Sequence, residues 1–190
     1  MRLPYIPKDP SFPDAEDQAI VSRVKQRRGS RGLIELDRAL LHAPPIADGW
    51  NSFLGAIRTK TSLSTSIRET AICRVAVLNK AWYEWDSHAP ILLSGHGVTE
   101  NDVSAVLKTP PRASEVKVVD EKHSAVMSYA DAMTLDVSVP DELFARLKKS
   151  FSEKEIVEIT ATIAAYNCVS RLLVALDVGE KNAQNGPTIQ

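Results

Sequence analysis

The stretch RETAICRVAVLNKAWYEWDSHAPILLSGHGV, residues 68–98, brings two glutamates, His88 and three large aromatic side chains into one predicted helical hairpin. Glu84 and His88 are four residues apart, so on a helix they lie on the same face, one turn from each other, and can interact. Glu69, on the preceding helix, is the natural third member of this group. We therefore interpret the stretch as an acid/base site, with His88, Glu84 and Glu69 as its candidate catalytic residues.

Helical periodicity extends through the rest of the chain. Residues 66–78 are apolar on nearly all sides, which is typical of a buried central helix. The next helix carries an apolar stripe that includes Trp85, with Glu84 and His88 at its edge, and Pro90 should kink or end this helix just after His88. No segment alternates apolar and polar residues over the length of a strand, so we predict an all-α fold of roughly eight helices around a central helical hairpin.

The proline distribution suggests the domain boundaries. Residues 1–13 hold four of the eleven prolines, which excludes a regular helix and predicts an extended N-terminal arm. Residues 14–178 are expected to form one helical domain, and residues 179–190 a polar tail.

Charge and composition narrow the function classes. The formal net charge of -1 and the pI near 6.4 give no electrostatic basis for binding nucleic acid or an anionic membrane. There is no run of 18 apolar residues, and the first residues lack the apolar core of a signal peptide. We expect a soluble, cytoplasmic protein that acts on a small-molecule substrate.

Each candidate residue also has a structural interpretation. Glu69 stands three residues after Ser66 and could serve only to cap a helix, while Glu84 and His88 could form a buried ion pair that fixes the hairpin. Glu69, Glu84 and His88 could together supply three metal ligands, but their spacing matches no tight metal motif, so no metal is expected.

The cysteines and the remaining histidines receive structural interpretations. Cys73 and Cys168 lie in apolar helical patterns and are expected to be buried, reduced thiols. His123 is expected on the exposed early turns of its helix, and His42, near a helix junction, could face a cavity.

The combined pattern resembles a known family. Ala81, Glu84 and His88 stand twelve, fifteen and nineteen residues after Glu69, and GVTENDV follows. With the later segments DEKHSAVMSYADAMT and VPDELFARLKKSFSEKEIVEITATIAAYN, this order resembles the carboxymuconolactone decarboxylase and alkylhydroperoxidase D-like (AhpD-like) superfamily over residues 30–178. The resemblance implies an AhpD-like helical bundle, a small-molecule site at the hairpin, and assembly as homotrimers or hexamers.

One departure from the family pattern bears on the chemistry. Peroxidase members of the family carry Cys-x-x-Cys where this chain has Ala81 and Glu84, so thiol-based peroxide reduction is not expected. The sequence YEWDSH instead resembles the decarboxylase branch, whose members work on carboxylated lactones without a metal or organic cofactor.

The residues are suited to such a reaction. Loss of carbon dioxide beside a carbonyl leaves an enolate, which His88 could protonate while Glu84 holds its tautomer and Glu69 acts as a relay or second base. Isomerisation, cyclisation or hydrolysis by the same pair remains open, as does a non-catalytic oligomeric binding protein. Four residues are predicted to bind the substrate. The rings of Tyr83 and Trp85 could form the pocket wall, and Arg74, or alternatively Arg68, could supply a positive charge to the substrate anion. Asn167, in the last helix, could close the site from the other side.

Overall fold

The computed structural model describes residues 1–114 and 116–187, and these group into two compact units. The first unit consists of Met1–Lys60 with Ala175–Glu180, and the second consists of Thr61–Val174 with the residues from Lys181 on. The described residues are helical or irregular, without a strand, so the all-α prediction is confirmed. The single domain over residues 14–178 stays a prediction, because a compact unit of contacts is not the same property as an independently folding domain.

The first unit contains three α-helices, α1 (Ala15–Arg28), α2 (Glu35–Leu40) and α3 (Pro44–Thr59), and two short 3₁₀ turns, η1 (Gly29–Arg31) and η2 (Val178–Glu180). Local signals set the bounds of α1. The Asp14 side chain accepts hydrogen bonds from the first turn, and Gly29 ends the helix with a φ of 60°, a conformation that costs glycine little. Proline at the first two positions of α3 fits the helix start, where no backbone donor is needed.

The N-terminal arm is held by backbone and ring contacts within this unit. Arg2 N donates to Leu176 O at 2.8 Å, and Gly179 N donates to the Tyr5 hydroxyl at 2.7 Å. The Arg38 guanidinium stacks over the Tyr5 ring and donates to Ile6 O. The arm is therefore extended, as its prolines predict, and joins the start of the unit to its end.

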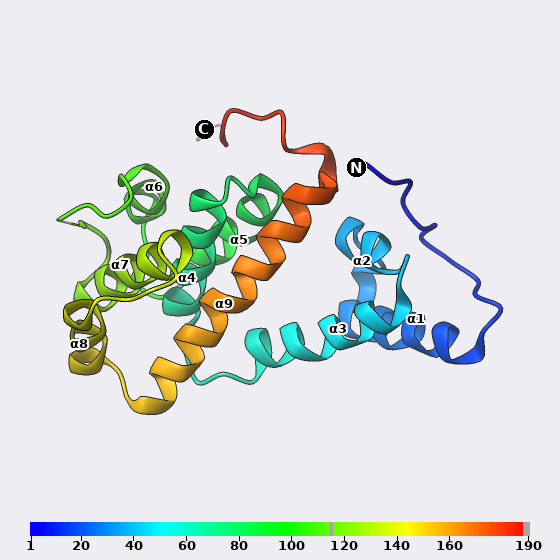
Figure 1. The fold of residues 1–190 in the computed structure, drawn as a ribbon, viewed down its shortest axis with the longest axis horizontal. Coiled ribbons are helices and arrows are strands. Elements are labelled where there is room, and N and C mark those ends of the chain that lie inside the picture. Colours follow the sequence, from blue (N-terminus) through cyan, green and yellow to red (C-terminus); the bar gives the residue numbers. More distant parts are fainter. Residues whose placement is uncertain (115, 188–190) are drawn as a thin grey trace. The chain divides into compact units, whose positions relative to one another are not determined.

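The second unit contains α4 (Thr65–Leu78), α5 (Trp82–Leu93), α6 (Glu100–Lys108), α7 (Glu121–Leu135), α8 (Asp141–Ser150) and most of α9 (Glu153–Leu176). Figure 1 shows α4 among the other helices of this unit, and α9 (orange) as the longest of them. Ten residues of α4 are buried, from Ser66 to Ala76, so the prediction of a buried central helix is correct.

The hairpin of α4 and α5 encloses a core that α6 and α7 complete. Its buried members are apolar side chains contributed by all four helices: Cys73, Ala76, Trp85, Leu92, Val106 and Met127. Pro90 lies inside α5, which continues to Leu93 rather than ending after His88. Just beyond α5, Gly95 lies so close to Ser66 that an added Cβ would meet the Ser66 Cα at 3.1 Å. The start of α4 and the end of α5 are thus fixed against each other.

Within the described residues, α9 alone is long and apolar enough to cross a membrane by length and composition. Of its most apolar window, 44% is buried inside the protein, and its inner face includes Ile159, Ile163, Tyr166 and Leu173. A core helix meets the same criteria, so this feature is weak evidence for a membrane span.

Candidate functional site

Glu69 and His88 meet across the hairpin. Glu69, in the second turn of α4, places Oε2 at 2.6 Å from His88 Nδ1 of α5, and both residues are buried, with 2% and 6% of their surface exposed. The other carboxylate oxygen, Oε1, accepts from Arg68 Nε at 3.1 Å. Because α4 is buried nearly all round, this carboxylate cannot turn to solvent, and its charge is directed at the histidine.

Tyr166 completes the group from α9. Its hydroxyl lies 3.2 Å from His88 Nε2, and the two rings meet edge to face with centroids 5.1 Å apart. Both ring nitrogens of His88 therefore have a polar partner. The three side chains form a chain that we call the Glu69–His88–Tyr166 triad.

The chemistry of the triad follows from which atoms can donate. An ionised carboxylate only accepts, so its bond to Nδ1 keeps a proton on that nitrogen. The neutral ring then offers a lone pair at Nε2, to which the Tyr166 hydroxyl can donate. When Nε2 takes up a proton, the bond reverses and the tyrosine oxygen accepts. The triad can thus take a proton and return it along one line of hydrogen bonds.

The structure corrects one predicted role. The sequence argument gave Glu84 the task of holding the His88 tautomer, but Nδ1 of His88 is hydrogen-bonded to the Glu69 carboxylate. Four-residue spacing brings two side chains onto the same face of a helix without making them point at each other, whereas α4 approaches the ring edge directly. Glu69 also does not act as a cap, since Ser64 is the N-cap residue of α4.

Glu84 and Cys73 lie near the triad. Glu84 is 2% exposed, and Cys73 is completely buried. Burial raises the pKa of the Cys73 thiol well above its usual range, and the negative charges of Glu69 and Glu84 raise it further. The prediction that Cys73 is buried and reduced is confirmed, and its environment opposes the thiolate form.

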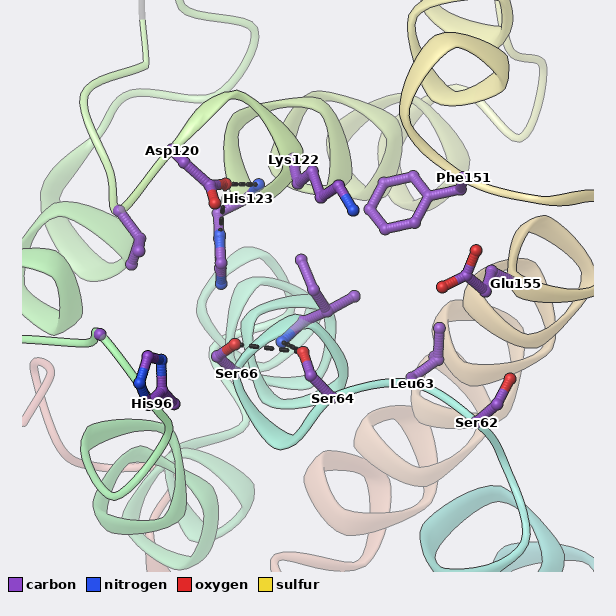
Figure 2. A pocket seen from close by; sticks show the side chains of 13 residues that line it. Ser62, Leu63, Ser64, Ser66, His96, Asp120, Lys122, His123, Phe151 and Glu155 are labelled. Carbon is purple, nitrogen blue, oxygen red and sulfur yellow. Dashed lines mark hydrogen bonds and ion pairs between the residues drawn. The ribbon is translucent and has the colours of Figure 1, made fainter.

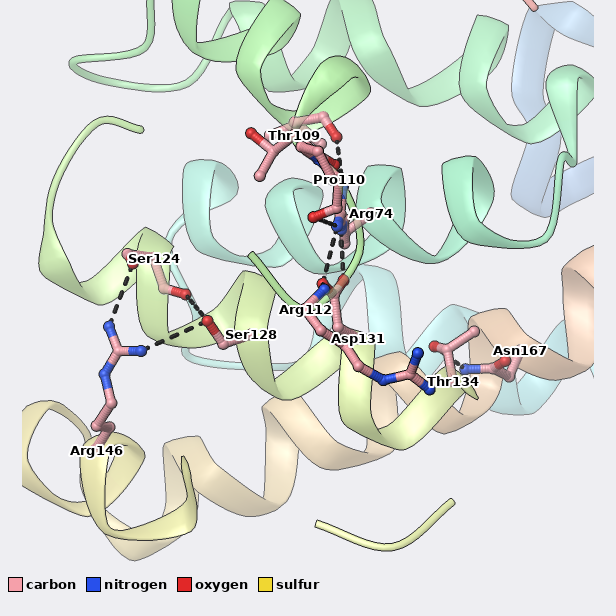
Figure 3. Close-up of polar contacts among 11 residues, drawn as sticks. Arg74, Thr109, Pro110, Arg112, Ser124, Ser128, Asp131, Thr134, Arg146 and Asn167 are labelled. Atoms are coloured by element: carbon pink, nitrogen blue, oxygen red, sulfur yellow. Dashed lines mark hydrogen bonds and ion pairs between the residues drawn. The ribbon is translucent and has the colours of Figure 1, made fainter. Parts of the chain in front are cut away.

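Arg74, predicted as a counter-charge for a substrate, is paired within the protein. Figure 3 shows its guanidinium directed at Asp131 of α7, with Nε at 2.5 Å from Oδ1 and NH2 at 2.9 Å from Oδ2. It also donates to the carbonyl oxygens of Val106, Thr109 and Pro110. The side chain is 1% exposed, and the substrate-binding role of Arg74 stays a prediction. A helical arginine can sit on a buried face when enough acceptors surround it.

Two other predicted substrate-binding residues, Trp85 and Asn167, also make contacts within the protein. Trp85 packs inside the hydrophobic core rather than forming a pocket wall. Asn167 donates to Thr134 Oγ1 at 2.9 Å and accepts from Asn79 at 3.2 Å, so it ties α9 to α7 and to the end of α4. Tyr83 is half-buried in the first turn of α5, and its predicted role stays a prediction.

Two expectations outside the hairpin are wrong. Cys168 is exposed, because it falls on the outer side of α9 between the buried positions Tyr166 and Val169. His123 is buried at 5% exposure, because in the first turn of α7 its side chain faces inward, whereas Glu121 and Lys122 are exposed.

Tyr166 is the member of the triad that the sequence argument did not identify. The spacing of Ile159, Ile163, Tyr166 and Ser170 marks the inner face of α9, so periodicity could have identified Tyr166 as buried. Among the residues described, no group of three or more histidine, cysteine, aspartate or glutamate side chains is arranged to hold a metal ion. The prediction of no metal stays a prediction.

The family model for the carboxymuconolactone decarboxylase family matches residues 44–110, which include Glu69, Glu84 and His88. No curated protein matches the chain.

Solved structures share the fold. An uncharacterised peroxidase-related protein from Silicibacter sp. TM1040 superposes with a TM-score of 0.70 at 16% identity, covering 94% of this chain and 93% of its own. A protein of unknown function from Agrobacterium tumefaciens, described in connection with the antioxidant defence protein AhpD, gives 0.64 at 22% identity, covering 78% and 95%. The debrominase Bmp8, solved with 2,3,4-tribromopyrrole, gives 0.63 at 19% identity, covering 86% and 84%.

At these identities the structural likeness establishes the fold, and the match to the family model covers the segment that carries the hairpin. The chain therefore has an AhpD-like fold, and its residues 44–110 match the carboxymuconolactone decarboxylase family.

Proposed function

We propose that the protein is a cofactor-independent acid/base enzyme that decarboxylates a small carboxylated lactone or β-keto acid. The observation that supports this most directly is the buried Glu69–His88–Tyr166 triad, with bonds of 2.6 Å and 3.2 Å at the two ring nitrogens of His88. The family supports an enzymatic role in general, since it includes decarboxylases and a structural relative is a debrominase.

In the proposed step, the bond between the substrate's carboxylate and the adjacent carbon breaks. Carbon dioxide leaves, and the electron pair passes into the neighbouring carbonyl as an enolate. A proton from His88 Nε2, delivered through the Tyr166 hydroxyl, then adds to carbon. Glu69 compensates the positive charge of the imidazolium that exists before the proton is given up. A general acid placed in this way typically contributes a factor of about 10²–10⁴ in rate.

Thiol-based peroxide reduction is disfavoured by the residues at the hairpin. Ala81 and Glu84 stand where a peroxidase would need two cysteines. Cys73 lies one helix earlier, fully buried, and burial together with two nearby carboxylates raises its pKa. Since the thiolate is the nucleophile in such reactions, Cys73 is a poor replacement.

The test is carbon dioxide release, measured with proton NMR in heavy water, on a panel of carboxylated lactones and β-keto acids. The informative variants are Glu69→Gln, His88→Gln and Tyr166→Phe. Tyr129→Phe is the matched control, because Tyr129 is also a buried tyrosine whose hydroxyl bonds to one neighbour, Thr160 Oγ1 at 3.0 Å, away from the triad.

We expect the native protein and Tyr129→Phe to release carbon dioxide and to incorporate deuterium at carbon. Tyr166→Phe should lose about 10²-fold in kcat, and His88→Gln at least as much. Deuterium exchange without carbon dioxide loss would replace the decarboxylase by an isomerase that uses the same triad. If all folded variants turn over like the native protein, the triad has no catalytic role.

The proposal extends to the protein's environment. We propose a cytoplasmic enzyme that assembles as a homotrimer or hexamer, as its superfamily resemblance implies. Light scattering coupled to gel filtration measures the mass directly, and a mass of about 21 kDa, that of one 20.9 kDa chain, would contradict assembly.

A further inference from the structure

A polar pocket lies in the same unit as the Glu69–His88–Tyr166 triad. It has a volume of about 430 Å³, and its lining includes Ser64, Ser66, His96, Lys122 and His123. Figure 2 shows these side chains around the start of α4, with the His123 ring directed into the space between them. The triad residues do not line it, so it is a separate feature of the fold.

Three helices begin at this pocket. Ser64 is the N-cap of α4, Asp120 is the N-cap of α7, and Glu155 lies in the first turn of α9. The first amides of a helix have no carbonyl partner within it, and a helix N-terminus carries about half a positive charge. Residues from three helix starts thus line one small volume.

The three helix starts differ in how their charge is compensated. Asp120 and Glu155 supply a carboxylate at the starts of α7 and α9, whereas the first turn of α4 contains no acidic residue. The Glu155 carboxylate is occupied, since Oε2 accepts from both Ser152 N and Ser152 Oγ at 2.8 Å. The start of α4 is therefore the uncompensated positive end in the pocket.

His123 gives independent evidence for a ligand. Nδ1 lies 2.6 Å from Asp120 Oδ1, and only 6% of the side chain is exposed, yet Nε2 is buried without a hydrogen-bond partner. A buried polar atom without a partner is costly, and such atoms commonly mark a position that a ligand fills.

The Asp120 carboxylate orients the His123 ring and favours its protonated form. Burial opposes its ionisation, but the hydrogen bonds from the His123 side chain and backbone prevail, so the pKa of Asp120 is lowered. An ionised Asp120 keeps the proton on Nδ1, and a second proton on Nε2 makes the ring a cationic donor that points into the pocket. Lys122, whose ammonium lies 5.5 Å from the Phe151 ring centre, adds a positive charge at the rim.

We propose that this pocket binds a small ligand through an oxyanion, a carboxylate or a phosphate group. His123 Nε2 and the first amides of α4 donate to the oxyanion, and Lys122 supplies a counter-charge. The site is independent of the proposed decarboxylation, so either proposal can fail while the other stands.

The test uses the full chain at pH 6, with inorganic phosphate and acetate as separate probes and sodium chloride at equal ionic strength as the background. Isothermal titration calorimetry measures affinity, and ¹⁵N NMR of the histidine side chains reports which ring responds. His123→Asn and Lys122→Gln are the test variants. The matched controls are His42→Asn, an exposed histidine bonded to Pro4 O in the other unit, and Lys148→Gln, an exposed lysine of α8.

We expect saturable binding of at least one probe, with the His123 Nε2 resonance moving as the site fills. The probe that moves it decides between a carboxylate and a phosphate ligand. His123→Asn should weaken binding about tenfold or more, because it removes a bond between charged groups, and Lys122→Gln should weaken it less. The two controls should bind like the native protein.

Two results would overturn the proposal. One is the absence of saturable binding by the native protein, in which case water alone satisfies Nε2. The other is binding that leaves the His123 resonance unmoved, which would place the anion elsewhere. The NMR measurement on the native protein keeps the test valid even if His123→Asn fails to fold.

Discussion

Replacing Arg74 by methionine should destabilise the protein strongly while leaving the chemistry of the triad in place. The guanidinium makes two bonds to Asp131 and three to the carbonyl oxygens of Val106, Thr109 and Pro110. Methionine leaves a carboxylate without its partner at a position where the two side chains are 1% and 4% exposed. Removing one member of a buried ion pair typically costs about 3–5 kcal/mol, and we expect a loss of this size.

Urea unfolding measures the loss. Because the chain forms two units, the transition of the second unit should be followed in a Trp50→Phe background, so that the fluorescence comes from Trp82 and Trp85. The matched control is Arg112→Met, which removes an exposed ion pair with Asp136 and should leave the midpoint unchanged.

The double variant Arg74→Met/Asp131→Leu sharpens the test. It removes both charges together, so its destabilisation should be smaller than the sum of the two single changes. If Arg74→Met unfolds within about 1 kcal/mol of the native protein, well below the 3–5 kcal/mol typical of a broken buried pair, the structural role is refuted. The prediction from the sequence that Arg74 is a counter-charge for the substrate would then gain support.

Three further changes test other parts of the structure. In the native protein at pH 8, a thiol reagent should modify Cys168 alone, and Cys73 should react only in denaturant. Rapid labelling of both cysteines would contradict the burial of Cys73 and the raised pKa of its thiol. The pKa of Asp120 is lowered in the folded protein, so the ionised carboxylate stabilises the protein at pH values above its ordinary pKa of 3.8. The unfolding curves of the native protein and Asp120→Asn should therefore differ at pH 7 and converge as the pH falls below the folded-state pKa. Ser64→Ala removes the cap of α4 and should cost about 1 kcal/mol by urea unfolding, whereas Ser114→Ala should cost nothing measurable.

Much of the helical architecture could be predicted because its signals are local. Asp14 caps α1, the Ser152 and Glu155 pair caps α9, and Pro140 stands directly before α8, as the sequence indicates. Each of these contacts joins residues three positions apart or fewer, so both partners can be recognised in one short segment of sequence. The end of α1 at Gly29 follows from the same kind of signal.

The site was harder to predict because its contacts connect distant segments. The sequence identified Glu69 and His88, but the choice between Glu69 and Glu84 as the His88 partner depends on how α4 approaches α5. Tyr166 lies 78 residues from His88, and periodicity alone places it on an inner face without saying which side chain it meets. The same limit explains Arg74, whose acceptors are carbonyl groups that no side-chain pattern reveals.

The arm contacts of the first unit have a consequence for biosynthesis. Arg2 and Tyr5 bond to Leu176 and Gly179, which are translated long after them. Residues 61–174 are translated between the two pieces of this unit, so the hairpin segment is available to fold while the first unit still lacks its final strip of chain. Until that strip emerges, the buried side chains of α2 have no η2 to cover them, so the first unit cannot complete its packing.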